Sequence, residues 1–480
     1  MTSALEKTIR NAVTQGVSAL HRFNRERMSA PATPNPYLTG PNRPMEREVT
    51  LERPVLRGRI PPALDGCYAR IGPNPLVKVN PANHHWFVGD GMVHGMRLQG
   101  GQALWYRNRW IRSTQVSEAL GEAPKPGPRH FSDTVNTNVL RHAGRAWALV
   151  EAGGWPVQLD GMLDTVAHDP FGGSLKGSFS AHPHLDTATG ALHAICYEAT
   201  DMNTLRHVVV GADGRVQREE PIAVQHGPSV HDCMITAHHV LVLDLPVTFS
   251  MSRFAAGYSF PYAWNPAHKA RVGILGKDAP GSDIVWCEVD PCYVFHPANA
   301  FETADGRITL DVVAHPTMFD DSRIGPSGGG AKFERWTIDP QAQRVARQGV
   351  DAQPQEFPRI DERFLGQAYR HAWAVQLQDD GRGEFMPGQV LIHHDLQAGR
   401  REVHDFGPGR LVSEFVFAPR HAEAAEGDGW LMGYVVDGPR QRSEFVILDT
   451  QAFGGEPVAV VEIPHAIPLG FHGNWMPASA

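Results

Sequence analysis

The amino-acid sequence predicts an all-β protein of the β-propeller type, and three observations lead to this prediction. Beyond residue 50 the 480-residue chain consists of short apolar runs cut by Gly, Asp and Pro, for example at 190–199, 239–247 and 444–449. The 48 glycines and 38 prolines supply many turns. Long helical periodicity is nearly absent beyond residue 50. A propeller accommodates many short antiparallel strands in one chain by radial repetition.

The N-terminal segment differs from the rest of the chain. A helix is predicted within residues 1–28, because apolar residues recur there with the period of one helix face; they are Leu5, Ile9, Val13, Val17 and Leu20. The stretch SAPATPNP at 29–36 is expected to be an extended linker, since prolines fix φ and lack a backbone donor. We therefore expect a helix and linker over 1–36 and a single propeller domain over 37–480. The helix either packs on the body or lies on a membrane surface.

Composition and charge exclude several classes of function. The net charge of −8 argues against a nucleic-acid partner, which needs a basic face. The five cysteines are an odd number without a CxxC pair, which is typical of a reduced, cytosolic protein. No apolar run has the length of a transmembrane helix or the pattern of a signal peptide. We expect a cytoplasmic protein, with peripheral contact at the inner face of the membrane as an open alternative.

Four of the 25 histidines stand out by their flanking residues. Each lies where a strand-like run meets a turn, the position from which a propeller presents side chains to its axis; they are His182, His231, His296 and His472. The other histidines are interpreted as surface or core residues. Because the last strand of a propeller usually completes a blade begun near the N-terminus, we expect the segment around His472 to be held in the body of the fold. Spacing alone leaves open whether the four converge.

Three glutamates occur within apolar, strand-like runs: Glu151, Glu356 and Glu414. A buried carboxylate needs a strong donor, and the ring N–H of a metal-bound histidine is one such donor. The alternative is that each glutamate lies on a solvated strand face. Four neutral imidazoles with carboxylates behind them suit Fe, Cu, Zn or Ni.

Ordered motifs occur over most of the chain; they include GCYARIGPNP (66–75), HWFVGDGMVHGMRL (85–98), DTVNTNVL (133–140), SAHPHLDTATGAL (180–192), VHDCMIT (230–236), FHPANAFE (295–302), QEFPRI (355–360), SEFVFAPR (413–420) and GFHGNW (470–475). Together these motifs resemble those of the carotenoid cleavage oxygenases. The departures are small: His184 stands where the family often has a Lys, and Ile71 where it has an Asn.

This resemblance implies a fold and a site. The fold would be a seven-bladed β-propeller with a helical and loop cap over the iron-bearing axis and a short N-terminal helix. One Fe(II) per chain would be bound by His182, His231, His296 and His472. The carboxylates of Glu151, Glu356 and Glu414 would orient three of these ligands, and Thr137 would lie beside the vacant coordination side of the iron.

The resemblance also implies a reaction: cleavage of one C=C bond of a carotenoid or apocarotenal by O2, giving two carbonyl products. No general acid or base is assigned. An apolar polyene needs an apolar tunnel, and the stretch 245–266 is rich in aromatic residues. We predict that the tunnel is lined by Phe249, Phe254, Phe260 and Trp264. The alternative is that these residues form ordinary core beneath a long loop.

Three other functions remain as alternatives. The stilbene-cleaving branch of the same family uses a Tyr and a Lys to bind a phenol, but segment 121–133 offers only Lys125, in a proline-rich context. A non-catalytic propeller scaffold would not need all seven His and Glu residues. A zinc hydrolase is disfavoured because catalytic zinc sites typically use three protein ligands. We therefore favour the carotenoid-cleaving function.

Overall fold

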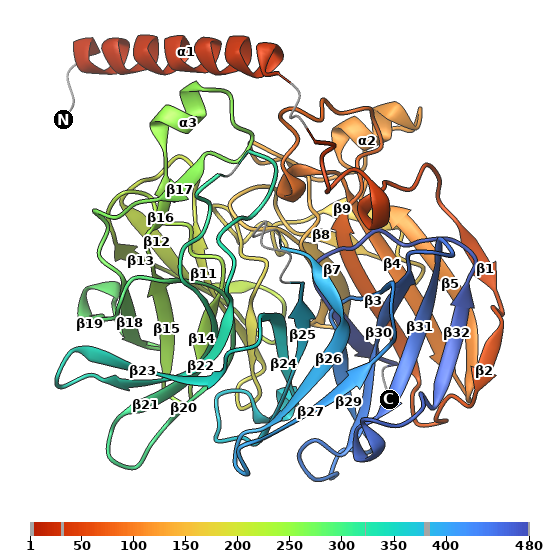
Figure 1. Ribbon diagram of the computed structural model, residues 1–480. Coiled ribbons are helices and arrows are strands. Elements are labelled where there is room, and N and C mark those ends of the chain that lie inside the picture. Colours follow the sequence, from red (N-terminus) through yellow and green to blue (C-terminus); the bar gives the residue numbers. More distant parts are fainter. Residues whose placement is uncertain (1–3, 30–32, 322, 379–384, 479–480) are drawn as a thin grey trace.

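Antiparallel strands make up most of the protein. The computed structural model describes residues 4–29, 33–321, 323–378 and 385–478, and of the helical residues 4–15 it describes the backbone alone. The described residues include 33 strands and only three α-helices. The sheets are arranged around a central axis (Figure 1). The predicted all-β class and propeller-like arrangement are confirmed.

Three sheets are four-stranded meanders in which consecutive strands pair antiparallel. The first contains β6 (Asn138–His142), β7 (Arg145–Leu149), β8 (Val157–Leu159) and β9 (Thr165–His168). The second contains β10 (His184–Asp186), β11 (Ala191–Tyr197), β12 (Thr204–Val210) and β13 (Val216–Ala223). The third contains β24 (Gln355–Ile360), β25 (His371–Leu377), β26 (Pro387–Asp395) and β27 (Arg400–Asp405).

An eight-stranded sheet consists of two such meanders joined edge to edge. One contains β14 (Cys233–Ile235), β15 (His239–Asp244), β18 (Arg271–Gly276) and β19 (Val285–Glu288). The other contains β20 (Tyr293–Glu302), β21 (Ile308–His315), β22 (Lys332–Asp339) and β23 (Arg344–Asp351). One parallel residue pair, Glu288 with Arg344, links β19 to β23. A separate ribbon of β16 (Val247–Phe249) and β17 (Tyr262–Trp264) encloses α3 (Met251–Ala255).

Two further sheets combine the two ends of the chain. One contains β1 (Thr50–Glu52), β3 (Gly66–Pro73), β4 (Gly91–Gln99), β5 (Gln102–Trp110) and β33 (Gly473–Pro477). The other contains β2 (Leu56–Gly58), β28 (Arg410–Val412), β29 (Val416–Pro419), β30 (Gly429–Asp437), β31 (Arg442–Asp449) and β32 (Ala459–Ile463). Strand β33 pairs antiparallel with β3, so the C-terminal segment is held as predicted.

Burial changes along each sheet from the axis outward. Every residue of β11, β21 and β30 is buried, which explains their nearly continuous apolar sequences. The outer strand β23 instead contains only exposed and half-buried residues. Charged residues on such an outer strand disfavour pairing with another chain. At the axis, the edge strands β10, β14, β20, β24, β29, β33 and β6 each contact the next.

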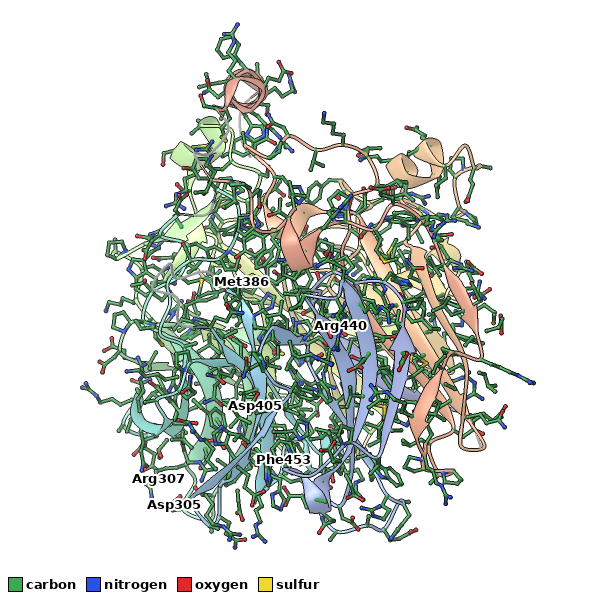
Figure 2. The ribbon with its side chains drawn as sticks, turned by 45° about the vertical axis from the view of Figure 1, so that its right-hand side comes forward. Asp305, Arg307, Met386, Asp405, Arg440 and Phe453 are labelled. Atoms are coloured by element: carbon green, nitrogen blue, oxygen red, sulfur yellow. The ribbon has the colours of Figure 1, made fainter. Side chains whose placement is uncertain are left out.

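Short helices and loops cover one end of the sheets. They include α2 (Thr114–Ala119) and the 3₁₀ turn η2 (Trp86–Val88), and Figure 1 shows α1 (Ala4–Arg27) lying across the same end above α3. In Figure 2, Asp305, Arg307 and Phe453 lie at the opposite end. The remaining 3₁₀ turns are η1 (Gly40–Asn42), η3 (Gly281–Asp283), η4 (Glu362–Phe364) and η5 (Thr450–Ala452).

The N-terminal helix α1 has 24 residues and lies within the segment 1–28 for which a helix was predicted. Its C-terminal half contacts α3: His21 Nδ1 lies 2.7 Å from the Phe254 carbonyl oxygen, and Asn24 Nδ2 donates to the Ala255 carbonyl at 2.8 Å. On the predicted apolar face, Val17 is half-buried and Leu20 is 47% exposed. The side chains of Leu5, Ile9 and Val13, and residues 30–32 of the predicted linker, lie outside the described residues. None of the described helices is long and apolar enough to cross a membrane.

Candidate metal centre and substrate cavity

The four predicted histidines converge at the axis, although they are far apart in sequence. His182 and His231 each lie two residues before an edge strand, β10 and β14 respectively. His296 lies on β20 where the register with β21 shifts between Val294 and Pro297. Such a bulge re-aims the side chain it carries. His472 directly precedes β33, and its carbonyl oxygen accepts from the Ile71 N–H of β3 at 3.0 Å.

The imidazoles form one compact, buried cluster. One ring nitrogen from each histidine lies within 4.8 Å of the corresponding atoms of the others, and all four residues are buried. The Nε2 atoms of His231 and His296 are 3.2 Å apart. His182 Nε2 is buried and has no hydrogen-bond partner among the described residues.

The three predicted glutamates lie behind three of these rings. His231 Nδ1 is 2.9 Å from Glu151 Oε1, His296 Nδ1 is 2.6 Å from Glu356 Oε2, and His472 Nδ1 is 3.0 Å from Glu414 Oε1. A carboxylate can only accept, so each Nδ1 carries the hydrogen. Each Nε2 therefore directs a lone pair toward the centre of the cluster.

Two residues that the sequence did not single out make further contacts with these carboxylates: His315 with Glu356, and Arg359 with Glu414. The second oxygen of Glu356 lies 2.8 Å from Nε2 of His315, at the end of β21. Glu414 also accepts from the Gly473 N–H at 2.8 Å and lies 3.4 Å from Arg359 Nη1. Glu356 and Glu414 are therefore fixed by more than the histidine that each one orients.

His182 differs from the other three because no glutamate lies behind it. The nearest carboxylate is Asp232, whose Oδ2 is 3.7 Å from His182 Nδ1, beyond hydrogen-bond distance. Asp232 Oδ1 lies 2.8 Å from Nε2 of His184 and accepts from the Cys233 N–H at 2.6 Å. His184, at the position where the family often has a Lys, is thus a partner of the carboxylate nearest to His182.

The pKa values follow from burial and these carboxylates. Burial lowers the pKa of His182 well below its ordinary value, and the neighbouring histidines lower it further. Burial also lowers the pKa of His472, to about 4, although Glu414 opposes this. Burial alone would raise the pKa of Glu356 and of Glu414. His296 near Glu356, and Arg359 and His472 near Glu414, nevertheless bring both pKa values to about 2. For His231, Glu151 outweighs burial and raises the pKa.

Backbone strain accompanies two of the glutamates. Phe357, which follows Glu356, has a φ of +54°, and Ala152, which follows Glu151, has a φ of +48°. Left-handed backbone is unusual for a non-glycine residue, and for a bulky residue such as Phe it is an outlier. At Phe357 it coincides with the register shift between β24 and β25, and the Phe357 ring stacks on His296 with centroids 5.4 Å apart.

A cavity of about 840 Å3 leads from the histidines to α1. Aromatic residues dominate its wall: Trp86, Phe87, Phe131, Tyr197, Phe249, Phe254, Tyr258, Phe260, Tyr262, Phe295, Phe357, Phe385 and Phe471. His231, His296 and His472 lie at its inner end together with Thr137, and Val17, Ser18 and His21 of α1 also line it. Thr137 lies next to His472, whose backbone N–H donates to the Thr137 carbonyl at 3.2 Å.

Three of the four predicted tunnel residues line this cavity, namely Phe249, Phe254 and Phe260. The prediction for Trp264 is corrected: Trp264 does not line the cavity and packs against the main hydrophobic core. The two residues differ in their position along the ribbon. Phe249 pairs with Tyr262, and both line the cavity, whereas Trp264 pairs with Val247, two residue pairs further along the ribbon.

Adjacency in the sequence to a predicted site residue would have identified other residues of the cavity wall. Phe295, Phe357 and Phe471 line the cavity, and each is the direct sequence neighbour of a predicted site residue. The α1 residues have no such signal, because their position depends on how a distant helix packs on α3.

The cluster fits a metal ion. With the hydrogens of His231 and His296 on Nδ1, two lone pairs face each other across 3.2 Å, which is unfavourable unless a cation or proton lies between them. The unpartnered Nε2 of His182 completes a set of four imidazole donors. Neutral imidazoles suit divalent transition metals, so these four residues can bind one such ion.

The fold and site thus define a propeller-like protein with a cluster of four histidines that can bind a metal ion, at the end of an aromatic cavity. Residues 42–477 match the family described as RPE65, retinal pigment epithelial membrane protein. The chain is 39% identical to a carotenoid cleavage oxygenase of Mycobacterium tuberculosis, covering 93% of this chain and 98% of that relative. The protein therefore belongs to the RPE65/carotenoid cleavage oxygenase family, and the resemblance found in its sequence is confirmed.

More distant relatives and two solved structures also match this chain. A carotenoid 9,10(9′,10′)-cleavage dioxygenase of Arabidopsis thaliana is 29% identical, with 94% of this chain and 92% of that protein covered. The crystal structure of Pseudomonas brassicacearum lignostilbene dioxygenase matches with a TM-score of 0.83 at 25% identity, over 94% of this chain and 100% of that one. Cobalt-substituted Synechocystis apocarotenoid oxygenase matches with a TM-score of 0.80 at 26% identity, over 91% and 97% of the two chains.

Proposed function

We propose that this protein is a non-haem Fe(II) dioxygenase that cleaves one C=C bond of a carotenoid or apocarotenal with O2, giving two carbonyl products. The observation that carries the proposal is the position of the four-histidine cluster, with three carboxylates behind it, at the inner end of an aromatic cavity. Membership of the family and the carotenoid-cleaving relatives support the choice of reaction.

His182, His231, His296 and His472 would hold one Fe(II) per chain, and Glu151, Glu356 and Glu414 would orient three of these ligands. Iron in this site would supply the redox chemistry that lets O2 react with an alkene. The chain itself would bind the polyene along the aromatic wall, exclude water and place one double bond beside Thr137. The cobalt-substituted form of the Synechocystis relative supports a metal site in this fold.

For the scaffold, we propose seven blades over residues 37–480, with residues 1–36 as helix and linker. Two observations support this count. The eight-stranded sheet is two meanders joined by a single residue pair, so that it counts as two blades. Seven edge strands follow one another around the axis, and Asn138 Nδ2 of β6 donates at 2.7 Å to the Ala181 carbonyl, near β10.

A stilbene substrate is the second candidate, because one structural neighbour is a lignostilbene dioxygenase and one relative a resveratrol cleavage oxygenase. The cavity favours the polyene. No Lys or Arg occurs among the described residues that line it, so a phenolate would find no cationic side chain there. Lys125, the one candidate from the sequence, does not line the cavity.

For access, we propose peripheral contact with the inner membrane surface on the side of α1. Four large apolar side chains are exposed around this end of the cavity: Leu20 at 47%, Phe23 at 50%, Phe131 at 65% and Met251 at 59%. Phe131 and Met251 also line the cavity. An apolar substrate could therefore pass from lipid into the cavity without crossing water.

The test is anaerobic reconstitution with Fe(II), followed by metal analysis of the wild type, His472→Ala and His404→Ala. His404 is a matched control, because it is equally buried but binds a backbone carbonyl, that of Phe453, far from the cluster. We expect about one iron in the wild type and control and almost none in His472→Ala. Assays with an apocarotenal and a hydroxystilbene would follow the two carbonyl products. Equal iron in His472→Ala, or cleavage of the stilbene alone, would contradict the proposal.

A further inference from the structure

The outer end of the cavity contains a polar side chain fixed in one orientation. His21 of α1 lines the cavity, and its ring stacks on Phe254 with centroids 4.4 Å apart and planes 11° apart. Its Nδ1 lies 2.7 Å from the carbonyl oxygen of Phe254. Phe254 of α3 thus holds the imidazole in two ways, by ring stacking and by the hydrogen bond from Nδ1 to its carbonyl oxygen.

Neighbouring contacts hold this turn of α1 in place. Asn24 Nδ2 donates to the Ala255 carbonyl at 2.8 Å, and Asn83 Nδ2 donates to the Arg25 carbonyl at 2.9 Å. Ser18, one turn before His21, lines the cavity from the same helix face. The position of His21 is therefore set by the packing of α1, and its ring is part of the cavity wall.

The contact with Phe254 decides what the other ring nitrogen can do. A carbonyl oxygen only accepts hydrogen bonds, so Nδ1 of His21 carries the hydrogen. In the neutral imidazole Nε2 is then a bare acceptor, and it has no hydrogen-bond partner among the described residues. An acceptor at this position can bind a hydroxyl group of a ligand but not a carbonyl oxygen.

We propose that His21 Nε2 accepts a hydrogen bond from a hydroxyl group at the end of the polyene that lies away from the cleaved bond. This inference rests on the proposed function and gives the substrate class: polyenes with a hydroxylated end group. The hydroxylated end is held at α1, and an aldehyde end is not. Because the polyene is stiff, capture of one end also determines which double bond lies beside the histidine cluster.

The test compares two apocarotenals of equal length, one with a ring hydroxyl and one without. Binding is measured anaerobically with the iron-loaded full-length protein, so that no substrate is consumed. We expect the wild type to bind the hydroxylated compound about fivefold more tightly, the value of one net hydrogen bond. His21→Phe keeps the aromatic stacking on Phe254 but lacks the acceptor. It should therefore bind the two compounds equally tightly, with an affinity ratio of about 1. Both proteins are measured at pH 8.

The conservative variant His21→Gln retains an acceptor oxygen and should recover part of the preference. The readout in each protein is the ratio of its affinities for the two compounds, so a general loss of binding through misfolding or altered packing cancels. An equal preference in the wild type and His21→Phe, or none in the wild type, would overturn the inference. If the hydroxyl preference is present and lost with His21, but admission of O2 yields no cleavage, the proposed function fails while the His21 subsite stands.

Discussion

The two ends of the cavity are built in different ways. At the inner end, histidines from edge strands of several sheets converge, and three of the four are oriented by carboxylates that the fold itself holds. At the outer end, α1 supplies part of the wall, and a few contacts to α3 and Asn83 hold this helix. A change at the inner end therefore disturbs a network, whereas a change at the outer end alters one surface. If His21 selects the substrate as proposed, the chemistry and the choice of substrate are separable in this molecule.

The largest effect should come from Glu356→Gln. This carboxylate orients His296 and also binds His315, and it is completely buried. An amide cannot accept from both imidazoles, so we expect metal affinity to fall by about 10- to 100-fold. Competition with a chelator measures the affinity, and thermal unfolding of the metal-free protein checks the fold. Unchanged affinity would show that Glu356 does not position the ligand.

A second large effect is the acid sensitivity of the metal-free protein. The pKa values of Glu356 and Glu414 are held at about 2, below the ordinary value of 4.5. A carboxylate with a depressed pKa stabilises the fold fully above its unfolded value, and that contribution is lost as the proton binds. We therefore expect the free energy of unfolding to fall as the pH decreases from about 4.5 to about 2.

Urea unfolding at a series of pH values measures this dependence. Glu414→Gln is the matching variant: it should be less stable at pH 6, and its stability should change less over the same acidic range. An equally steep pH dependence in this variant would assign the effect to other groups.

The contrast between the two ends also explains what could be predicted from the sequence. Glu356 lies in an apolar run, where a buried carboxylate is costly unless it has a partner. His472 precedes a terminal strand, an unusual position for a residue without a role. The inner end could therefore be inferred from residue chemistry and family motifs. His315 closes an ordinary apolar strand, and nothing in that sequence reveals its contact with Glu356. Trp264 was placed wrongly because composition does not show how far along the ribbon the cavity wall extends.

The outer end was beyond prediction for a further reason. Helical periodicity identifies α1, but it does not specify that His21 packs against Phe254, 233 positions away in the chain. His21 had the same appearance in the sequence as the many surface histidines. Its orientation results from tertiary packing between two short segments, neither of which carries a motif for the contact.

A smaller effect is expected within the inner end itself, at His182. Asp232 lies 3.7 Å from His182 Nδ1 and is a weaker partner than the glutamates behind the other rings. Asp232→Asn keeps an oxygen that can accept from His184. We expect metal affinity to fall only about two- to threefold, corresponding to roughly 0.5 kcal/mol. Competition with a chelator measures the metal affinity of both Glu356→Gln and Asp232→Asn. Equal losses of affinity would mean that a carboxylate orients His182 as strongly as the other three histidines.

The smallest effect on the metal centre should follow removal of residues 1–28. No contact of the described α1 residues reaches the four histidines directly, because the cavity and α3 lie between them. Iron content should therefore equal that of the full chain, while the hydroxyl preference assigned to His21 disappears with the helix. A loss of iron would show that α1 supports the inner end, and the two ends would then have to be treated as one coupled unit. Retained iron together with a retained hydroxyl preference would place the selecting group on the body, where Tyr258 of the cavity wall would be the next residue to test.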